Sequence, residues 1–129
     1  MMKESEMSLP LILTGKIVHG KGLGRTVGMP TANLSIANTE LPEAGVYATR
    51  IRIGEEIYDS VTNIGRRPSV DCDQHITVET YIFDFHENIY GETVALELLK
   101  FLRPIIKFQN LEEVYEQVKR DIEEAKKYL

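Results

Sequence analysis

The sequence contains a single cysteine, Cys72, and no tryptophan among its 129 residues. One cysteine excludes a disulfide framework and a zinc ribbon, because both need several cysteines. No apolar run approaches the ~18 residues that suggest a membrane span. The start, MMKESEMS, is polar and acidic and lacks the basic and apolar stretches of a signal peptide. These absences predict one soluble, cytoplasmic domain over residues 1–129, with no membrane partner.

Acidic residues are missing from one part of the chain, although the formal net charge is -5. No Asp or Glu lies between Met7 and Thr39, whereas Lys16, Lys21 and Arg25 do. A negative net charge disfavours nucleic acid as a partner, because binding phosphates requires a basic surface. The electropositive early segment favours a small anionic ligand that is bound locally.

Short apolar runs bounded by turn signals dominate the first hundred residues and predict about six strands. These runs cover residues 11–20, 31–36, 45–53, 56–64, 76–85 and 92–102. Gly54-Glu55, between the third and fourth runs, predicts a tight hairpin. The run 92–102 also fits a helix by composition, and we interpret it as a strand. The pattern is typical of a small antiparallel barrel or sandwich over about residues 9–104.

The last segment, about residues 110–129, predicts a helix. Asn110 followed by Glu113 forms a capping-box pattern, which marks a helix start. Glu112 and Glu113 begin the helix and Lys126 and Lys127 end it, as the macrodipole favours. An apolar stripe recurs at helical spacing and is expected to pack on the core; it consists of Leu111, Val114, Tyr115, Val118, Ile122, Ala125 and Leu129.

A glycine-rich stretch resembles two nucleotide-binding motifs but completes neither. GKIVHGKG nearly spells a P-loop, yet Gly22 replaces the Ser or Thr that binds magnesium, and GKGLG is an incomplete dinucleotide fingerprint. Gly20, Gly22 and Gly24 would still let backbone N–H groups approach a polyphosphate. Lys21 and Arg25 could add positive charge. A hairpin loop with solvated cations is the alternative interpretation.

The tetrapeptide PTAN places two neutral oxygen ligands close together. Thr31 and Asn33 are two residues apart, so in an extended segment their side chains face the same way. A hydroxyl and an amide carbonyl suit magnesium, and Pro30 fixes the approach of the chain. Two neutral ligands hold magnesium weakly, so nucleotide phosphates would have to complete the coordination shell. An Asx-type turn is the alternative.

A glutamate interrupts the strand-like run ITVETYIF. Glu79 is expected on the same face as Tyr81 and Phe83, and it could accept a proton from a substrate hydroxyl. A solvent-facing glutamate on an edge strand is the alternative, although glutamate is depleted in strands. The three histidines show neither metal-ligand spacing nor a Ser-His-Asp arrangement.

Taken together, these motifs resemble the riboflavin kinase (flavokinase) family. The landmarks occur in the family's order: GKIVHGKGLGRTVGMPTANL (15–34), GVY (45–47), NIGRRPS (63–69), VETYIFDF (78–85), YG (90–91), LRP (102–104) and KFQNLEEV (107–114). The resemblance implies a six-stranded antiparallel Greek-key barrel with a C-terminal helix. It also implies ATP-dependent phosphorylation of riboflavin, with FMN and ADP as products.

The resemblance further implies roles for residues on the nucleotide side of the site. Thr31 and Asn33 would bind magnesium, or another divalent cation, together with ATP. The loop Gly20–Arg25, with Lys21, Gly22 and Gly24 inside it, would cover the phosphates. Tyr90 would lie near the nucleotide.

On the flavin side, Glu79 matches the family's catalytic glutamate, and Arg103 with Phe108 falls in the flavin-binding segment. Some positions depart from the family's usual residues: Ser69 and Val70 replace Thr-Phe, Tyr81 replaces a common His, and Ile105 replaces an acidic residue. These departures motivate one alternative, a flavin-binding or regulatory module that has lost phosphoryl transfer.

Two further expectations concern architecture and partners. Bacterial relatives usually carry this domain behind an N-terminal adenylyltransferase, but only about fourteen residues precede the first landmark here. We therefore expect either a stand-alone kinase or a piece of a bifunctional enzyme, acting as a monomer. A small barrel that binds oligonucleotides is disfavoured by the net charge of -5.

Overall fold

The computed structural model describes residues 9–18, 31–36, 42–68, 74–85 and 87–129. The strands are β1 Leu11–Val18, β2 Ala32–Ile36, β3 Gly45–Ile53, β4 Glu56–Pro68, β5 Gln74–Ile82 and β6 Thr93–Arg103. They are followed by the helix α2, Leu111–Ala125. The predicted phosphate loop, Gly20–Arg25, and the departures Ser69 and Val70 lie outside the described residues.

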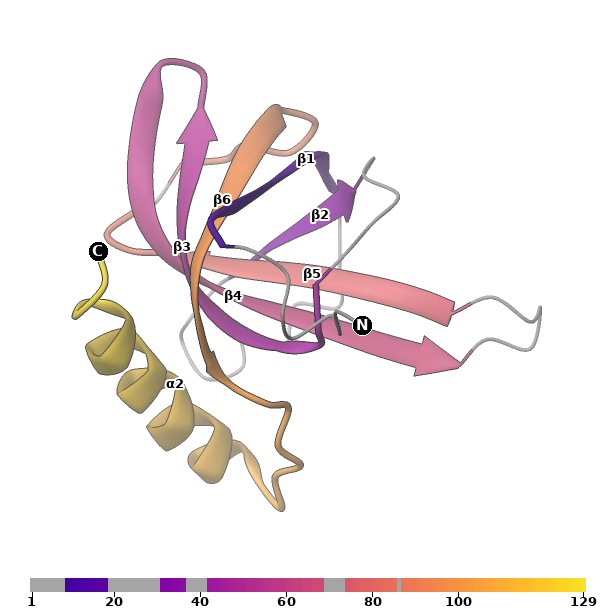
Figure 1. The fold of residues 1–129 in the computed structure, drawn as a ribbon, viewed down its shortest axis with the longest axis vertical. Helices are drawn as coiled ribbons and strands as arrows, with labels where there is room; N and C mark the ends of the chain where they lie inside the picture. Colours follow the sequence, from indigo (N-terminus) through magenta and orange to yellow (C-terminus); the bar gives the residue numbers. More distant parts are fainter. Residues whose placement is uncertain (1–8, 19–30, 37–41, 69–73, 86) are drawn as a thin grey trace.

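The strands form one closed barrel in the order β1-β2-β5-β4-β3-β6, and every neighbouring pair is antiparallel. Strands β3, β4 and β5 are consecutive neighbours, and β6 returns to lie beside β3, which is a Greek key. The helix lies against one side of this barrel (Figure 1). The prediction of a six-stranded Greek-key barrel with a C-terminal helix is therefore confirmed. The ambiguous run 92–102 is a strand.

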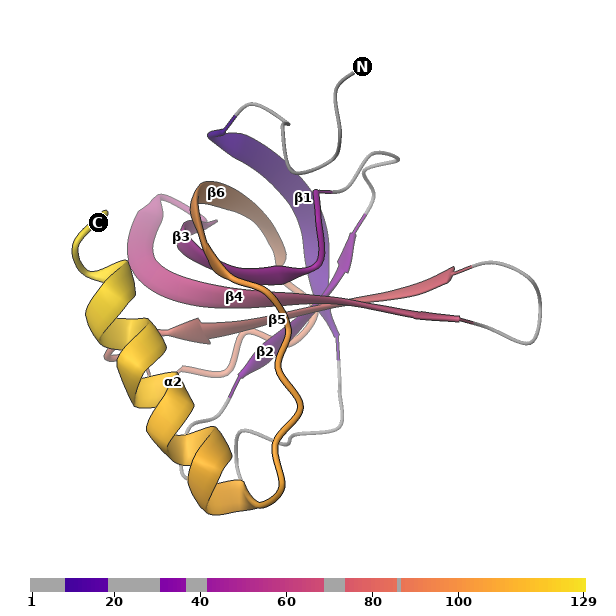
Figure 2. The same cartoon turned by 60° about the horizontal axis from the view of Figure 1, so that its bottom comes forward.

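The hairpin between β3 and β4 follows the predicted turn, and β4 is longer than predicted. Gly54 has a φ of 62°, which the primed turn of a two-residue hairpin needs, and Ile53 pairs with Glu56 on either side of it. Strand β4 continues four residues past the predicted end at Ile64, because its backbone stays paired with β5 as far as Pro68. The β4–β5 pair thus projects beyond the barrel on the side away from the helix (Figures 1 and 2).

The barrel interior combines an apolar core with a chain of buried hydroxyls. The apolar part contains Leu13, Ile17, Leu34, Tyr47, Ile51, Ile64, Val78, Ile82, Val94, Leu96 and Leu98. The hydroxyl of Thr49 hydrogen-bonds Ser60 at 2.7 Å and Thr62 at 2.9 Å, and Thr62 also hydrogen-bonds Thr80 at 2.8 Å. All four side chains are fully buried, so each hydroxyl needs the others as partners. The chain ties β3, β4 and β5 together from inside.

Helix α2 covers part of the outer face of the barrel. Ala125 is fully buried against a cluster that includes Val46, Ala48 and Val61, with Ile122 and Leu129 packed beside it. The N-terminal part of the predicted apolar stripe behaves differently, because Leu111 is 52% and Tyr115 is 37% exposed. The expectation that the whole stripe packs on the core was therefore wrong for its first turns.

The helix start matches the predicted cap in most respects. The side-chain oxygen of Asn110 accepts a hydrogen bond from the backbone N–H of Glu113 at 2.9 Å. The Glu113 carboxylate accepts from the backbone N–H of Gln109 at 2.9 Å, one residue before the cap. At the other end the helix stops at Ala125, so the lysines at 126 and 127 follow the last turn rather than forming it.

Candidate active site

Three polar residues from three neighbouring strands lie in one row on the outer face of the barrel. Glu79 on β5 pairs with Asn33 on β2 and with Asn63 on β4. Residues directly opposite in antiparallel strands point to the same face, with Cβ atoms about 4.5–5.5 Å apart. The neighbours of Glu79 along β5, Val78 and Thr80, are buried inside the barrel, so Glu79 points outward. The carboxylate is therefore flanked by two carboxamides.

The face of β5 that carries Glu79 continues toward the helix. Tyr81 and Phe83 share this face, as predicted, because the residues that alternate with them are buried in the barrel. The two rings are 5.8 Å apart, and Phe83 packs against the cluster that α2 covers. The site therefore has a polar side, at Asn33 and Glu79, and an apolar side that leads to the helix.

The Thr31 hydroxyl is a buried oxygen without a hydrogen-bond partner among the described residues. A buried hydroxyl normally has a partner, since its desolvation is otherwise uncompensated. Thr31 directly precedes β2, and Asn33, two residues on, is half-buried on the same side of the extended segment. This donor set of neutral hard oxygens fits a magnesium ion that shares its other ligands with phosphate.

The end of β1 and the segment that carries Tyr90 meet beside Asn33; both were predicted to lie on the nucleotide side of the site. Val18, the last residue of β1, pairs with Asn33. The backbone of Ile17 donates to Glu92 and accepts from Gly91, both at 2.9 Å. Tyr90 is thereby held beside the end of β1, with its side chain 54% exposed. The loop residues predicted to cover the phosphates, Gly20, Lys21, Gly22, Gly24 and Arg25, lie outside the described residues.

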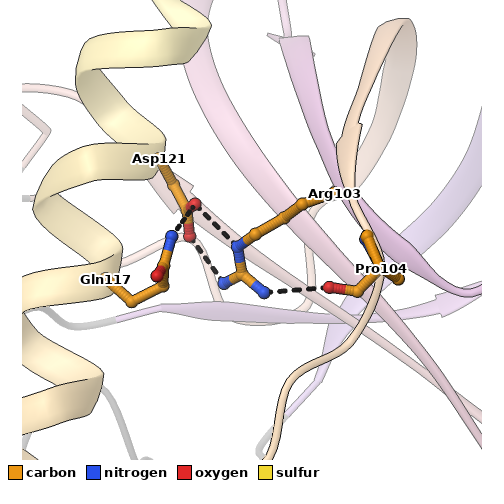
Figure 3. A network of polar contacts seen from close by, with 4 residues as sticks. All are labelled: Arg103, Pro104, Gln117 and Asp121. Atoms are coloured by element: carbon orange, nitrogen blue, oxygen red, sulfur yellow. Dashed lines mark hydrogen bonds and ion pairs between the residues drawn. The ribbon is translucent and has the colours of Figure 1, made fainter.

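The two residues predicted on the flavin side have different surroundings. The Arg103 guanidinium donates to the Asp121 carboxylate of α2 at 2.8 and 2.7 Å (Figure 3). Phe108 is half-buried in the connection between β6 and α2. Arg103 belongs to the outer-face row of Glu79, because Asn63 pairs with Val46, which in turn pairs with Arg103.

Sequence reasoning missed two residues that the fold places at or near this row. Asn63 begins the landmark NIGRRPS, but no role followed from it without its partner strand. Asp121 is 5% exposed, and it falls at helical spacing between Val118 and Ala125 of the apolar stripe. A charged residue on a buried helix face was the available signal, because such a charge requires a partner.

The described residues contain no group of three or more His, Cys, Asp or Glu side chains arranged to hold a metal ion. Among the described helices, none is long and apolar enough to cross a membrane.

The fold is thus a closed Greek-key barrel, with a row of polar side chains on its outer face as the candidate ligand site. The family model of riboflavin kinase (flavokinase) matches residues 7–129. The chain is 36% identical over 128 residues to the bifunctional riboflavin kinase/FMN adenylyltransferase of Haemophilus influenzae, which covers 98% of this chain and 41% of that protein. It is also 38% identical over 111 residues to the RNA-binding riboflavin kinase RibR of Bacillus subtilis, covering 86% of this chain and 48% of that protein. The chain belongs to the riboflavin kinase family.

Solved structures agree with this fold. A structure of a protein named for macrolide efflux, from Streptococcus pneumoniae, superposes with a TM-score of 0.88 at 35% identity, covering 93% of this chain and 40% of that one. The riboflavin kinase of Trypanosoma brucei superposes with a TM-score of 0.60 at 23% identity, covering 92% of this chain and 76% of that one. The chain spans about two fifths of the length of the bifunctional relatives that it matches.

Proposed function

We propose that this protein is a riboflavin kinase, which transfers the γ-phosphoryl group of ATP to the ribityl 5′-hydroxyl of riboflavin. Membership of the family supports the activity. The observation that carries the assignment to a site is the row of Asn33, Glu79 and Asn63 on adjoining strands. Next to it lies the Thr31 hydroxyl, which has no hydrogen-bond partner within the described part of the chain. Phosphoryl transfer requires mainly positioning and charge stabilisation, which such a row of fixed oxygen and amide groups can supply.

The reaction proceeds as an in-line displacement at the γ-phosphorus. The riboflavin 5′-oxygen forms a bond to phosphorus as the bond from phosphorus to the β,γ-bridging oxygen breaks, and ADP leaves with that electron pair. The proton of the 5′-hydroxyl passes to the Glu79 carboxylate, which acts as general base. The carboxamide of Asn63 orients the Glu79 carboxylate from the neighbouring strand.

Thr31 and Asn33 are the residues that would hold magnesium or another divalent cation. When bound with ATP, such a cation neutralises phosphate charge during transfer. Asn33 lies directly opposite Glu79 in the paired strands. Thr31, two residues earlier, faces the same side of the extended chain. Tyr90, on the segment held against β1, borders the nucleotide.

The proposed partners are riboflavin and ATP, with FMN and ADP as products. The Bacillus subtilis relative is named for RNA binding. We propose no nucleic-acid partner for this protein, because its net charge of -5 disfavours binding to phosphates. Cytoplasmic location and a monomeric state remain our proposals, and the single cysteine supports a reducing compartment.

The direct test incubates the purified protein with riboflavin, ATP and magnesium and follows the flavins by chromatography over time. FMN that accumulates, and stops accumulating when EDTA is added, establishes the kinase and its metal requirement. Bound riboflavin without any FMN would instead identify a flavin-binding module and overturn the proposed activity.

A further inference from the structure

A network of polar contacts joins the end of β6 to the middle of α2 (Figure 3). The Asp121 carboxylate accepts from Nε and Nη2 of Arg103 at 2.8 and 2.7 Å, which is a bidentate pair. Nη1 of Arg103 donates to the Pro104 carbonyl at 3.0 Å. The Gln117 amide donates to Asp121 from one turn earlier in the helix, also at 3.0 Å. We call this network the Arg103–Asp121 clasp.

The clasp occupies all three nitrogens of the guanidinium. The side chain of Arg103 is 16% exposed and that of Asp121 is 6% exposed, so the ion pair is largely withdrawn from water. The ion pair holds the Arg103 side chain in this position, because separating it from Asp121 would leave two buried charges without a partner. Arg103 is therefore oriented toward the helix rather than toward a ligand.

The clasp also holds one end of the segment that carries Phe108. This connection runs from Pro104 to Asn110, and its first carbonyl is bonded by Arg103. Its other end is held by α2 as well, through the bonds of Glu113 with Gln109 and Asn110. Between the two anchors, Ile105 and Ile106 are 46% and 44% exposed. The connection thus presents apolar side chains from a segment that is fixed at both ends.

The position of the clasp relates the connection to the candidate base. Arg103 lies on the row that runs through Val46 and Asn63 to Glu79, three strand spacings or roughly 14 Å away along the barrel surface. β3 and β6 approach closely here: a Cβ on Gly45 would lie 2.7 Å from the Arg103 carbonyl oxygen. The anchor of the connection and Glu79 therefore belong to one continuous run of paired strands, β6-β3-β4-β5.

We propose that Asp121, supported by Gln117, is a positioning residue for riboflavin. By holding Arg103, it fixes the connection 104–110 at a set place beside the Glu79 row, so that a flavin bound there presents its 5′-hydroxyl to Glu79. Arg103 then serves the flavin site through the backbone that it anchors and not through its charge. This inference rests on the proposed riboflavin kinase function.

The decisive variant removes both charges together, Arg103→Met with Asp121→Leu. Replacing a buried ion pair by apolar residues of similar volume often leaves stability unchanged, so this protein is expected to fold. We expect its kcat/KM for riboflavin to fall on the order of 10²-fold, since small misplacements remote from the chemistry have effects of this size. The fall lies in the KM for riboflavin, while the KM for ATP stays unchanged. Thermal unfolding of the same samples checks the fold.

A matched control exists on the same helix. Glu124 and Lys127 form an ion pair at 3.1 Å with side chains 47% and 68% exposed, and Glu124→Ala is expected to change neither KM. The single change Asp121→Asn keeps one acceptor oxygen for Arg103 but removes the negative charge. It should raise the KM for riboflavin in any folded fraction. A folded double variant with an unchanged KM for riboflavin overturns the inference.

The inference can be separated from the proposed activity by measuring binding directly. Quenching of riboflavin fluorescence on titration with protein gives a dissociation constant that needs no turnover. If the wild-type protein forms no FMN, the proposed kinase activity is wrong. A riboflavin dissociation constant that rises about 10²-fold in the double variant, some 2.8 kcal/mol, would still support the clasp. An unchanged constant would overturn it.

Discussion

Glu79 lies directly opposite Asn33 in the antiparallel pair of β5 and β2, with both side chains on the outer face of the barrel. The two residues are 46 positions apart in sequence, and the pairing of β2 with β5 makes them neighbours. This pairing places the proposed base beside a proposed metal ligand, which is the arrangement that phosphoryl transfer to a hydroxyl requires.

Replacing Glu79 by glutamine should remove the base while preserving size. We expect kcat to fall by roughly 10²–10⁴-fold, the usual contribution of a general base, with little change in riboflavin binding. FMN formation by chromatography and fluorescence quenching measure the two quantities. Glu97→Gln is the control, because Glu97 is a half-buried strand glutamate that pairs with Arg50 away from the site. Wild-type turnover in the Glu79 variant would rule out this role.

Removing the oxygen ligands should change the dependence on magnesium. Thr31→Val deletes the buried hydroxyl but keeps the shape of the side chain, and Asn33→Leu deletes the amide. We expect the magnesium concentration at half-maximal rate to rise by at least the ~10–100-fold associated with losing an outer-shell partner. In this case the hydroxyl deletion should not reduce stability, since the hydroxyl has no partner among the described residues. A variant with unchanged magnesium dependence would refute its ligand role.

Asn63→Ala tests the residue on the other side of Glu79. In the proposed mechanism the Asn63 amide donates to the Glu79 carboxylate, and a hydrogen bond to a charged group contributes about 1.5–3 kcal/mol. We therefore expect kcat to fall roughly 10- to 100-fold. The KM for ATP should not change, because Asn33 and Thr31 are untouched. Asp59→Ala on the same face of the same strand is the control, since Asp59 is exposed and pairs with Arg50. Equal kcat values for both variants and the wild type would remove Asn63 from the site.

The hydroxyl chain inside the barrel predicts a specific loss of stability. Thr62→Val breaks the bonds to Thr49 and Thr80 and leaves the Thr80 hydroxyl buried without its partner. The free energy of unfolding should fall by roughly 1–3 kcal/mol, measured by urea denaturation. The same substitution at exposed Thr93 should have almost no effect. If both variants are as stable as the wild type, the chain does not contribute to stability.

The helix cap offers a smaller effect that can be tested in the same way. Asn110→Ala removes the bond to the backbone N–H of Glu113 and should lower the free energy of unfolding by about 1 kcal/mol. Asn110→Asp keeps the acceptor and should remain close to the wild type. An alanine variant as stable as the aspartate variant would show that the cap is dispensable.

Local patterns in the sequence determined much of this protein. Short apolar runs between turn signals predicted five of the strands, and an apolar repeat at helical spacing predicted the helix. The alternation of side chains along an extended chain put Thr31 with Asn33, and Glu79 with Tyr81, each on one face. The cap at Asn110 followed from residues only three positions apart. Every one of these features depends on neighbours along the chain.

The tertiary structure decided what joins residues that are distant in sequence. The run at 92–102 becomes a strand because β1 and β3 pair with it on both sides, which its composition alone did not settle. The pairing of β4 with β5 brings Asn63 beside Glu79. The packing of α2 on the barrel places Asp121 against Arg103. Which carboxylate meets which cation or amide depends on strand order and helix placement, and these are set by burying the whole core at once rather than by any local segment.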